Sequence, residues 1–508
     1  MLAALLLAAG SYAKVSRAFF CSYDDFEEVY RSATRDASDP GRMFTTTHFG
    51  TQRYRPLNRV ANLVAWKAGG FDAAAFRVRN LLCHLANVAL VFAIGRLLFP
   101  APGAAAIAAL LFAVHPLANM TVAGAVVTNT LAYAFLLGAV WLFAWSLAHP
   151  SPWRLVGAGL LAAMAALTYD LAMVVFPILG LMLACSLVWP TGQHAAGRRA
   201  AGLALLTSAI LILVLRLAFA PGAMARQAEN WPTPGRFFRD SVISLAALVN
   251  PFDPVLASSV FGFPTPSPQT LRAVAPWAVL LALLLAAVAV WWIRRAGAAR
   301  WRERVIAESD RRGIAILATS LFAAVALSAL VAKRPSETYL YLPAALLALL
   351  VGAFLQRWRE SRSGRIVAPA AVLVLVAAGT AATVVRNGEV ARCGDTAKRI
   401  LAGVPCPPPG GHGVLRFSDL GEAPATRRYG LYGFRGIDTI GDGDHSDSAL
   451  TAALRLSCSN PTVAAKRVAR ASAPPCPAAP RTEQSEIFQV DADGRVVACE
   501  RKTSSPPS

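Results

Sequence analysis

Residues 78–99 read VRNLLCHLANVALVFAIGRLLF, an almost continuous apolar run. A helix needs about 20 mostly apolar residues to cross a lipid bilayer, and this run has that length. The same criterion finds about eleven candidate spans, at approximately 2–20, 78–99, 102–118, 122–147, 153–169, 171–189, 200–220, 274–293, 313–332, 339–356 and 366–386. We therefore expect an all-α polytopic membrane bundle of about 11 transmembrane helices.

The composition agrees with a membrane protein. Hydrophobic residues make up 56% of the 508-residue chain and charged residues only 15%, whereas about a quarter of the residues are charged in an ordinary soluble domain. The net charge of +20 raises the question of nucleic-acid binding. The basic residues, however, form short clusters between apolar runs, so we exclude a nucleic-acid partner. No phosphate-binding loop or dinucleotide fingerprint occurs, which argues against a cytosolic nucleotide-driven enzyme.

Basic loops predict the orientation of the bundle. Arg198 with Arg199, the 294–312 loop and the 357–365 loop are separated by even numbers of spans, so the positive-inside rule places them in the cytoplasm. The first outer loop, 21–77, and everything after about 387 then lie outside. We predict a multi-pass protein of the bacterial inner membrane whose C-terminal domain is in the periplasm.

Lys333 and Arg334 break this pattern, because the same topology puts their short turn outside. One explanation is ordinary snorkelling of the two side chains to the membrane interface. The other is that the two cations bind an anionic substrate.

The sequence divides into two expected domains. Residues 1–387 form the membrane domain, and residues 388–508, with nearly balanced charge, form a small extracytoplasmic α/β domain with a disordered end. In the second domain we expect strands at 414–417, 487–490 and 496–499 and a helix at 448–456 capped by Asp447. Its cysteines lie where disulfides persist, and they are Cys393, Cys406, Cys458, Cys476 and Cys499.

An acidic pair, Asp24 and Asp25, follows the first candidate span. Adjacent carboxylates repel each other, which raises one pKa or recruits a cation. Such a pair suits a general base or a metal ligand, so a divalent cation is a possible cofactor and the metal ligands are unknown. The alternative is a solvated acidic turn that caps the next helix.

Polar residues form a stripe on the second candidate span. Arg77, Asn80, His84 and Asn87 recur at helical spacing and therefore share one face. Such a stripe must face protein or a watery cavity, because lipid would leave it unpaired. Interhelical hydrogen bonding is the competing explanation for the deeper His84 and Asn87. For Arg77 and Asn80, near the outer end, we favour an anion site.

Three further features lie at the predicted outer surface. Arg53 and Arg55 belong to a basic cluster in the first outer loop, which suits either a phosphate group or anionic lipid headgroups. Asp170 interrupts an apolar run and marks the turn of a helical hairpin. His115 and Pro116, near the outer end of the third candidate span, indicate either a kink or a ligand, and we favour the kink.

The order of these motifs resembles the GT-C superfamily of membrane glycosyltransferases, and more narrowly its protein O-mannosyltransferase-like branch and bacterial relatives. The resemblance extends over roughly residues 15–345. It rests on the acidic pair, Tyr54-Arg55-Pro56-Leu57, Phe76-Arg77 with Asn80 to His84 and Asn87, His115-Pro116, and Ser336-Glu337-Thr338-Tyr339-Leu340-Tyr341-Leu342-Pro343.

The resemblance implies an inverting transferase that moves a sugar from a polyprenyl-phosphate donor to a lipid, glycan or protein acceptor at the extracytoplasmic face. Asp24 or Asp25 would deprotonate the acceptor. The residues expected to bind the donor phosphate are Arg53, Arg55, Arg77, Lys333 and Arg334. The residues expected to bind other parts of the substrates are Asn80, His84, Asp170, Glu337 and Tyr339.

Two other functions remain open. A transporter or flippase of a lipid-linked or anionic substrate also needs polar stripes and basic residues on the outer side, although no internal repeat supports it. A catalytically inactive relative could act as an assembly partner. Substitution of the acidic pair distinguishes both from a transferase.

Overall fold

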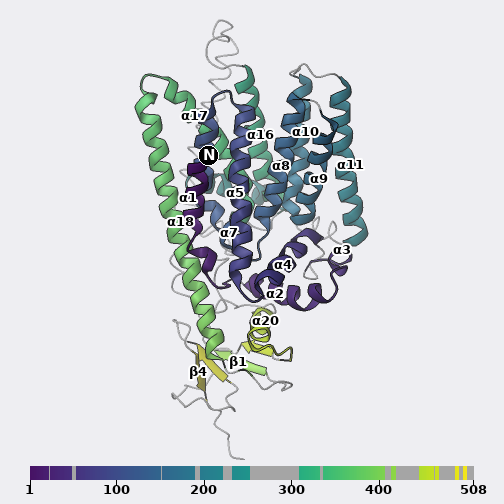
Figure 1. Ribbon diagram of the computed structural model, residues 1–508, viewed down its shortest axis with the longest axis vertical. Coiled ribbons are helices and arrows are strands. Elements are labelled where there is room, and N and C mark those ends of the chain that lie inside the picture. Colours follow the sequence, from purple (N-terminus) through teal and green to yellow (C-terminus); the bar gives the residue numbers. More distant parts are fainter. Residues whose placement is uncertain are drawn as a thin grey trace, which may run out of the picture.

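The computed structural model describes residues 1–21, 23–48, 53–149, 151–188, 195–220, 231–251, 308–331, 336–404 and 406, and then 414–418, 446–462, 464–467, 487–490 and 496–499. Long helices form a bundle, and shorter elements gather at one end of it (Figure 1). The bundle helices are α1 (Leu2–Tyr12), α5 (Ala73–Leu98), α6 (Pro102–Ala113), α8 (Asn129–Ala148), α9 (Pro152–Thr168), α10 (Val175–Val188), α11 (Ala195–Phe219), α16 (Glu308–Val331), α17 (Glu337–Glu360) and α18 (Gly364–Gly403).

The bundle is all-helical, and the chain is a multi-span membrane protein. Within the described residues, six helices are long and apolar enough to cross a membrane, or seven if one bent pair forms a single span. Each predicted span in this part coincides with helix, but α1 and α9 are short. The candidate span 274–293 lies outside the described residues. The total of about 11 transmembrane helices therefore stays a prediction.

Several predicted spans are not continuous helices, and in 122–147 the long helix begins only at Asn129. The first, 2–20, breaks after α1 into a short 3-10 helix, Val15–Arg17, where Lys14 and Arg17 interrupt the apolar run. The third bends at His115 and Pro116, and the helices on either side, Pro102–Ala113 and Pro116–Ala123, meet at 56°. The predicted kink is confirmed, since proline lacks the N–H that a continuous helix requires.

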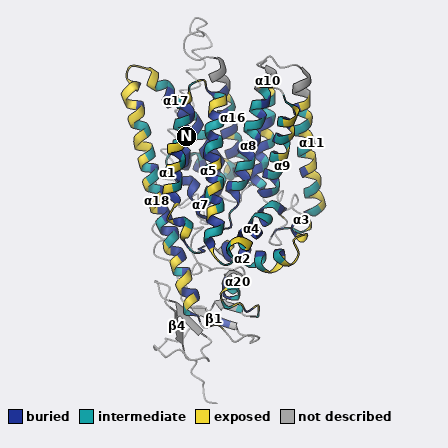
Figure 2. Cartoon of the chain, in the orientation of Figure 1, coloured by how far each residue is buried: buried dark blue, intermediate teal, exposed yellow. Residues whose placement is uncertain are grey.

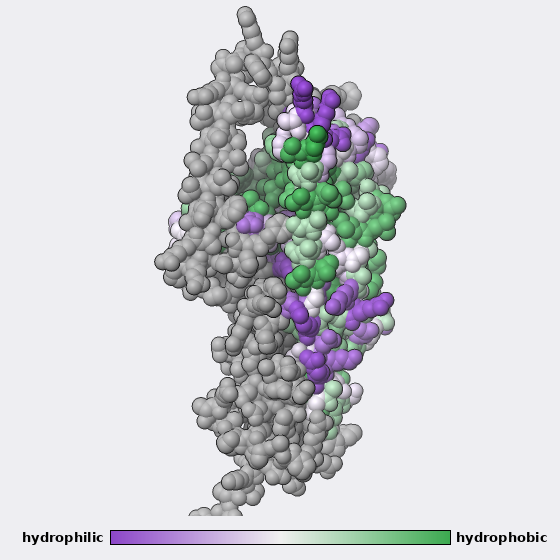
Figure 3. Space-filling model, turned by 90° about the vertical axis from the view of Figure 1, so that its left-hand side faces the viewer, coloured by the Kyte–Doolittle hydropathy of each residue, from purple (hydrophilic) through white to green (hydrophobic). Residues whose placement is uncertain are grey.

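Side chains on the outside of the bundle are apolar and exposed. Helices α11 and α18 carry many exposed residues on their outer sides (Figure 2), among them Leu203, Ile210, Leu373 and Val374. On one side of the molecule, hydrophobic residues form a band between two hydrophilic zones (Figure 3). This pattern is that of a surface in contact with lipid.

The first loop and the C-terminal segment lie at the same end of the bundle (Figure 1). The loop contains α2 (Tyr23–Arg31), a π-helical turn (Ser32–Asp36), α3 (Arg42–Thr45) and α4 (Pro56–Gly69). Helix α18 is 40 residues long and continues beyond the bundle toward α20 (Ser446–Cys458). It runs without a break across residue 387, so the division into domains at that point stays a prediction.

The C-terminal segment contains a four-stranded sheet of order β2-β1-β3-β4. Its strands are β1 (Val414–Ser418), β2 (Ala464–Arg467), β3 (Ile487–Val490) and β4 (Val496–Cys499). The strands predicted at 487–490 and 496–499 are confirmed as β3 and β4, which pair in antiparallel fashion. The predicted cap is wrong, because α20 already begins at Ser446 and therefore includes Asp447.

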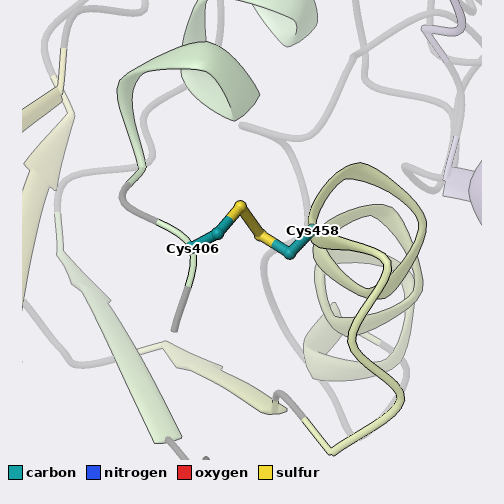
Figure 4. Close-up of a disulfide and its surroundings, with 2 residues drawn as sticks. All are labelled: Cys406 and Cys458. Atoms are coloured by element: carbon teal, nitrogen blue, oxygen red, sulfur yellow. A yellow bond between two sulfur atoms is a disulfide. The ribbon is translucent and has the colours of Figure 1, made fainter. Parts of the chain in front are cut away.

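The C-terminal segment is fastened to the rest of the chain. A disulfide joins Cys406, just after α18, to Cys458 at the end of α20, with 5.3 Å between the Cα atoms (Figure 4). A hydrophobic core separate from that of the bundle includes Phe26 of α2, Ile400 of α18 and Leu450 of α20. Helix α20 thus packs on α2, the helix that carries the acidic pair.

Candidate active site

Asp25 is buried and bonded to the protein backbone. Its side chain is fully buried in the first turn of α2. One carboxylate oxygen accepts a hydrogen bond from the backbone N–H of Cys21 (3.1 Å), and the other accepts one from the backbone N–H of Val126 (3.3 Å). Asp25 therefore joins the start of α2 to a segment that precedes α8.

Asp24 has the opposite environment. The residue as a whole is exposed, yet burial of its carboxyl group raises its pKa to about 7, and the negative charges of Asp25, Glu28 and Glu27 act in the same direction. Arg53 opposes this rise. Exposure and pKa describe different properties here: solvent reaches the side chain, while protein atoms surround much of the carboxyl group. A carboxyl group that titrates near neutral pH suits a general base.

Asp170 holds two arginine side chains. It begins a short 3-10 helix, Asp170–Val174, between α9 and α10, as expected for the turn of a hairpin. Nε of Arg55 donates to Asp170 over 2.7 Å, and Nη1 of Arg216 donates to its other carboxylate oxygen over 2.8 Å. Arg55 also lies over the ring of Tyr169, with Cζ 4.8 Å from the ring centroid. The position of Arg55 is therefore fixed by two contacts.

The charge of Arg53 acts both on Asp24 and on the residues around Arg55. The side chain of Arg53 is exposed, and the residues around Arg55 on which its charge acts are Asp170 and Tyr169. Tyr339, at the start of α17, interacts electrostatically with Arg55. We call Asp24, Arg53, Arg55, Asp170, Arg216 and Tyr339 the outer cluster.

The polar stripe of α5 is occupied by protein partners. Arg77 is buried, and its three nitrogen atoms contact the carbonyl oxygens of Ala123 and Ala18 and the sulfur of Cys21. Asn80 is buried and donates to the carbonyl oxygen of Gly124 over 2.6 Å. The structure thus places Arg77 and Asn80 as supports of the segments next to the acidic pair.

Deeper in the bundle, the stripe joins helices. Nδ2 of Asn87 donates to the hydroxyl of Tyr341 on α17 over 3.0 Å, and that hydroxyl lies 2.7 Å from Nδ1 of His84. Nε2 of His84 lies 3.3 Å from the carbonyl oxygen of Ala113 on α6. His84 and Asn87 thus make the interhelical hydrogen bonds that the competing explanation requires, and the substrate-binding role of His84 stays a prediction.

Glu337 pairs with an arginine of another helix. It is fully buried and pairs with Arg386 of α18, whose Nη2 is 2.6 Å from Oε2 of Glu337. This ion pair joins α17 to α18, which is a structural role. Lys333 and Arg334 lie outside the described residues.

Sequence analysis missed Arg216 and Arg386, the partners of Asp170 and Glu337. Both stand near the ends of apolar runs. A charged residue within a transmembrane segment generally has a partner or a function, and that was the available signal. The partners could not be identified, because they lie 46 and 49 residues away in the chain.

The described residues contain no group of three or more histidine, cysteine, aspartate or glutamate side chains that could hold a metal ion. Both oxygens of Asp25 already accept backbone hydrogen bonds. We therefore derive no step through a cation, and a divalent cation at the acidic pair stays a prediction.

Comparison with known proteins finds a family model that matches part of the chain. Residues 63–219 match the model of the family described as dolichyl-phosphate-mannose-protein mannosyltransferase. No curated protein sequence matches the chain.

Among solved structures, the archaeal oligosaccharyltransferase AglB from Archaeoglobus fulgidus, with an inhibitory peptide and a dolichol-phosphate, is similar at a TM-score of 0.50 and 12% identity. The similarity covers 92% of this chain and 64% of that one. ArnT from Cupriavidus metallidurans is similar at a TM-score of 0.49 and 15% identity in the apo state, over 91% of this chain and 84% of that one. The ArnT structure with undecaprenyl phosphate gives a TM-score of 0.47 and 14% identity, with the same coverage.

The predicted resemblance to the GT-C superfamily is confirmed, through the match over residues 63–219 and the fold shared with the archaeal enzyme. The chain spans 64% of the length of that enzyme.

Proposed function

We propose that this GT-C-like chain transfers a sugar from a polyprenyl-phosphate donor to an acceptor hydroxyl at the extracytoplasmic face of the bacterial inner membrane. The description of the matching family, which names a dolichyl-phosphate sugar donor, supports this class of donor. The dolichol-phosphate in the archaeal structure supports it as well. The proposal leaves open which sugar is moved and whether the acceptor is a lipid, a glycan or a protein.

The observation that carries the proposal is the difference between the two adjacent carboxylates. Asp25 is buried and bonded to two backbone amides, whereas Asp24 is exposed and has a pKa of about 7. A base is most effective when its pKa lies near the working pH. We therefore assign the role of general base to Asp24 and a positioning role to Asp25.

The reaction is a single displacement. The acceptor oxygen attacks the anomeric carbon while Asp24 takes the proton of the hydroxyl group. The bond from the anomeric carbon to the phosphate oxygen breaks, and the polyprenyl phosphate leaves with the electron pair. Attack from the face opposite the leaving group inverts the anomeric carbon.

The leaving phosphate needs nearby positive charge, and the outer cluster supplies it. Arg53 is exposed, and Arg55 is held by Asp170 and Tyr169. Fixed cations stabilise developing negative charge without reorganising during the reaction. We propose that Arg53 and Arg55 bind the phosphate, with Tyr339 beside them. Lys333 and Arg334 remain proposed phosphate ligands, while the nitrogen atoms of Arg77 already contact protein atoms.

The Cys406–Cys458 disulfide supports the proposed orientation. Disulfides persist in oxidising compartments such as the bacterial periplasm and are rare in the cytosol. This disulfide fastens α20, which packs on α2 at the end of the bundle where Asp24 lies. The proposed active site and the C-terminal segment therefore share the extracytoplasmic side.

The test is transfer of a labelled sugar from polyprenyl-phosphate donors by the purified protein in lipid vesicles. We expect Asp24→Asn to lower the rate about 10²- to 10⁴-fold, the usual contribution of a general base. The matched control is Asp39→Asn, which changes an exposed carboxylate in the same loop and leaves the rate unchanged. Full activity of a folded Asp24→Asn variant contradicts the assignment of the base.

The same vesicles test the other two functions. Movement of the labelled donor across the membrane without transfer of its sugar identifies a transporter or flippase. No transfer and no movement with any donor, while host glycans stay unchanged after deletion of the gene, identifies an inactive relative.

A further inference from the structure

Helix α2 carries a second buried acidic residue one turn after Asp24. Glu28 follows Asp24 by four positions, so the two side chains project from the same side of the helix. Oε1 of Glu28 lies 2.7 Å from Nε2 of His48, and the two side chains are only 3% and 7% exposed. The displacement described above gives this pair no task.

His48 connects α2 to Arg53. The backbone N–H of His48 donates to the carbonyl oxygen of Arg53 over 2.8 Å, in an isolated antiparallel bridge. Arg53 is the cation whose charge opposes the raised pKa of Asp24. A continuous series of contacts therefore leads from α2, through Glu28 and His48, to the residue that acts on Asp24.

The surroundings of the pair lower the pKa of both of its members. Burial lowers the pKa of His48, and the positive charges of Arg55 and Arg31 lower it further. Glu28 acts in the opposite direction and raises it. Burial by itself would raise the pKa of Glu28, but His48, Arg31 and Arg59 outweigh it and hold that pKa below its ordinary value. A neutral imidazole that donates from Nε2 to an ionised carboxylate is consistent with both directions.

We propose that Glu28 and His48 are a positioning pair, which ties the backbone of Arg53 to the helix of Asp24 and so keeps the cation in place beside the base. The inference rests on the proposed function of Asp24. It goes beyond that function because neither residue touches substrate. Loss of the pair leaves Asp24 in place but withdraws a positive charge from its surroundings.

The first test is the pH dependence of kcat/KM in variants of the pair. The acidic limb is the part of the profile in which kcat/KM rises with pH. We expect His48→Ala to move this limb to higher pH by about half a pH unit, which corresponds to about threefold lower kcat/KM at pH 6. His48→Gln retains a side-chain donor for Glu28 and is expected to restore much of the original profile. An unchanged limb in a folded His48→Ala variant overturns the proposal.

A matched control separates positioning from stability. Asp36 pairs with Arg59 in the same loop and is equally buried, but it does not act on Asp24. We expect Asp36→Asn to lower the melting temperature without moving the acidic limb. An equal movement of the limb in Asp36→Asn and His48→Ala would mean that the pair has only a structural role.

A double substitution tests the route through Arg53. If His48 acts by placing Arg53, then His48→Ala should not move the limb further once Arg53→Gln has removed the cation. Additive movement in the double variant overturns this route, because independent sites add and coupled sites do not.

A measurement that needs no transfer distinguishes failure of this inference from failure of the proposed function. Asp24→Cys places a thiol at the position of the base, and its alkylation by iodoacetamide can be followed against pH by mass spectrometry of the labelled peptide. We expect His48→Ala to shift this alkylation curve to higher pH. An identical curve with and without His48 overturns the positioning pair, even if transfer is observed.

Discussion

The polar stripe of α5 and the outer cluster both contain arginine, but their arginine side chains differ in their partners. Arg77 of the stripe is buried against two backbone carbonyl oxygens and a sulfur atom. Arg53 of the outer cluster is exposed, and Arg55 is held by a carboxylate and an aromatic ring. A polar residue in a membrane bundle therefore indicates a substrate site only where the fold leaves it accessible.

The acidic pair shows the same contrast between neighbours in the sequence. The two carboxylates share a helical turn, yet backbone amides from separate segments bond only to Asp25. The comparison predicts that changes in the stripe affect stability and that changes in the outer cluster affect transfer.

Arg77→Gln should show the largest effect on stability. It leaves the carbonyl oxygens of Ala18 and Ala123 without their donor, which costs about 1–3 kcal/mol for each buried group. We expect a clearly lower melting temperature in detergent and a poor yield of folded protein. The control is Arg53→Gln, which should melt like the wild type because its side chain is exposed. Equal melting of the two variants would remove the distinction between the two regions.

Cys406→Ser tests how strongly the C-terminal segment is fastened to the outer end. The disulfide closes a loop with a sequence separation of 52, and such a link stabilises by about 2–4 kcal/mol. We expect a lower melting temperature and weaker protection of α20 from proteolysis. Cys83→Ser, which changes a free cysteine of α5, serves as the control and should have little effect. Identical proteolysis of the two variants contradicts the prediction.

Tyr341→Phe removes the hydroxyl that joins α5 to α17. Its loss leaves His84 and Asn87 each without one partner, at a cost of about 1–3 kcal/mol. We expect a moderately lower melting temperature and an unchanged rate of transfer per folded molecule. A large loss of transfer with normal melting would instead place this part of the stripe in the active site.

The pH profile of the wild type tests the outer cluster without any substitution. Transfer requires the ionised form of Asp24, whose pKa is about 7. The rate should therefore rise as the pH increases through about 7, and fall about tenfold for each pH unit below the pKa. The profile of kcat/KM between pH 5 and 9 checks this expectation. A rate that is constant down to pH 5 would assign the base to a group with an ordinary carboxyl pKa.

Sequence analysis located the helices well because hydropathy is a local property. It also placed Arg77, Asn80, His84 and Asn87 on one face, since helical spacing is fixed. It did not separate Arg77 from Arg53 and Arg55 as candidates for phosphate binding. That separation depends on carbonyl groups and carboxylates from other helices, which the spacing of residues in one helix does not reveal.

The sequence by itself determined a multi-span helical bundle, the resemblance to GT-C enzymes and an acidic pair close to basic residues. Apolar runs and short motifs are sufficient for these conclusions, because each depends on residues near one another in the chain. Only the tertiary structure decided which carboxylate is accessible. The amide that bonds to Asp25 belongs to Val126, 101 residues further along the chain, and folding alone brings the two together.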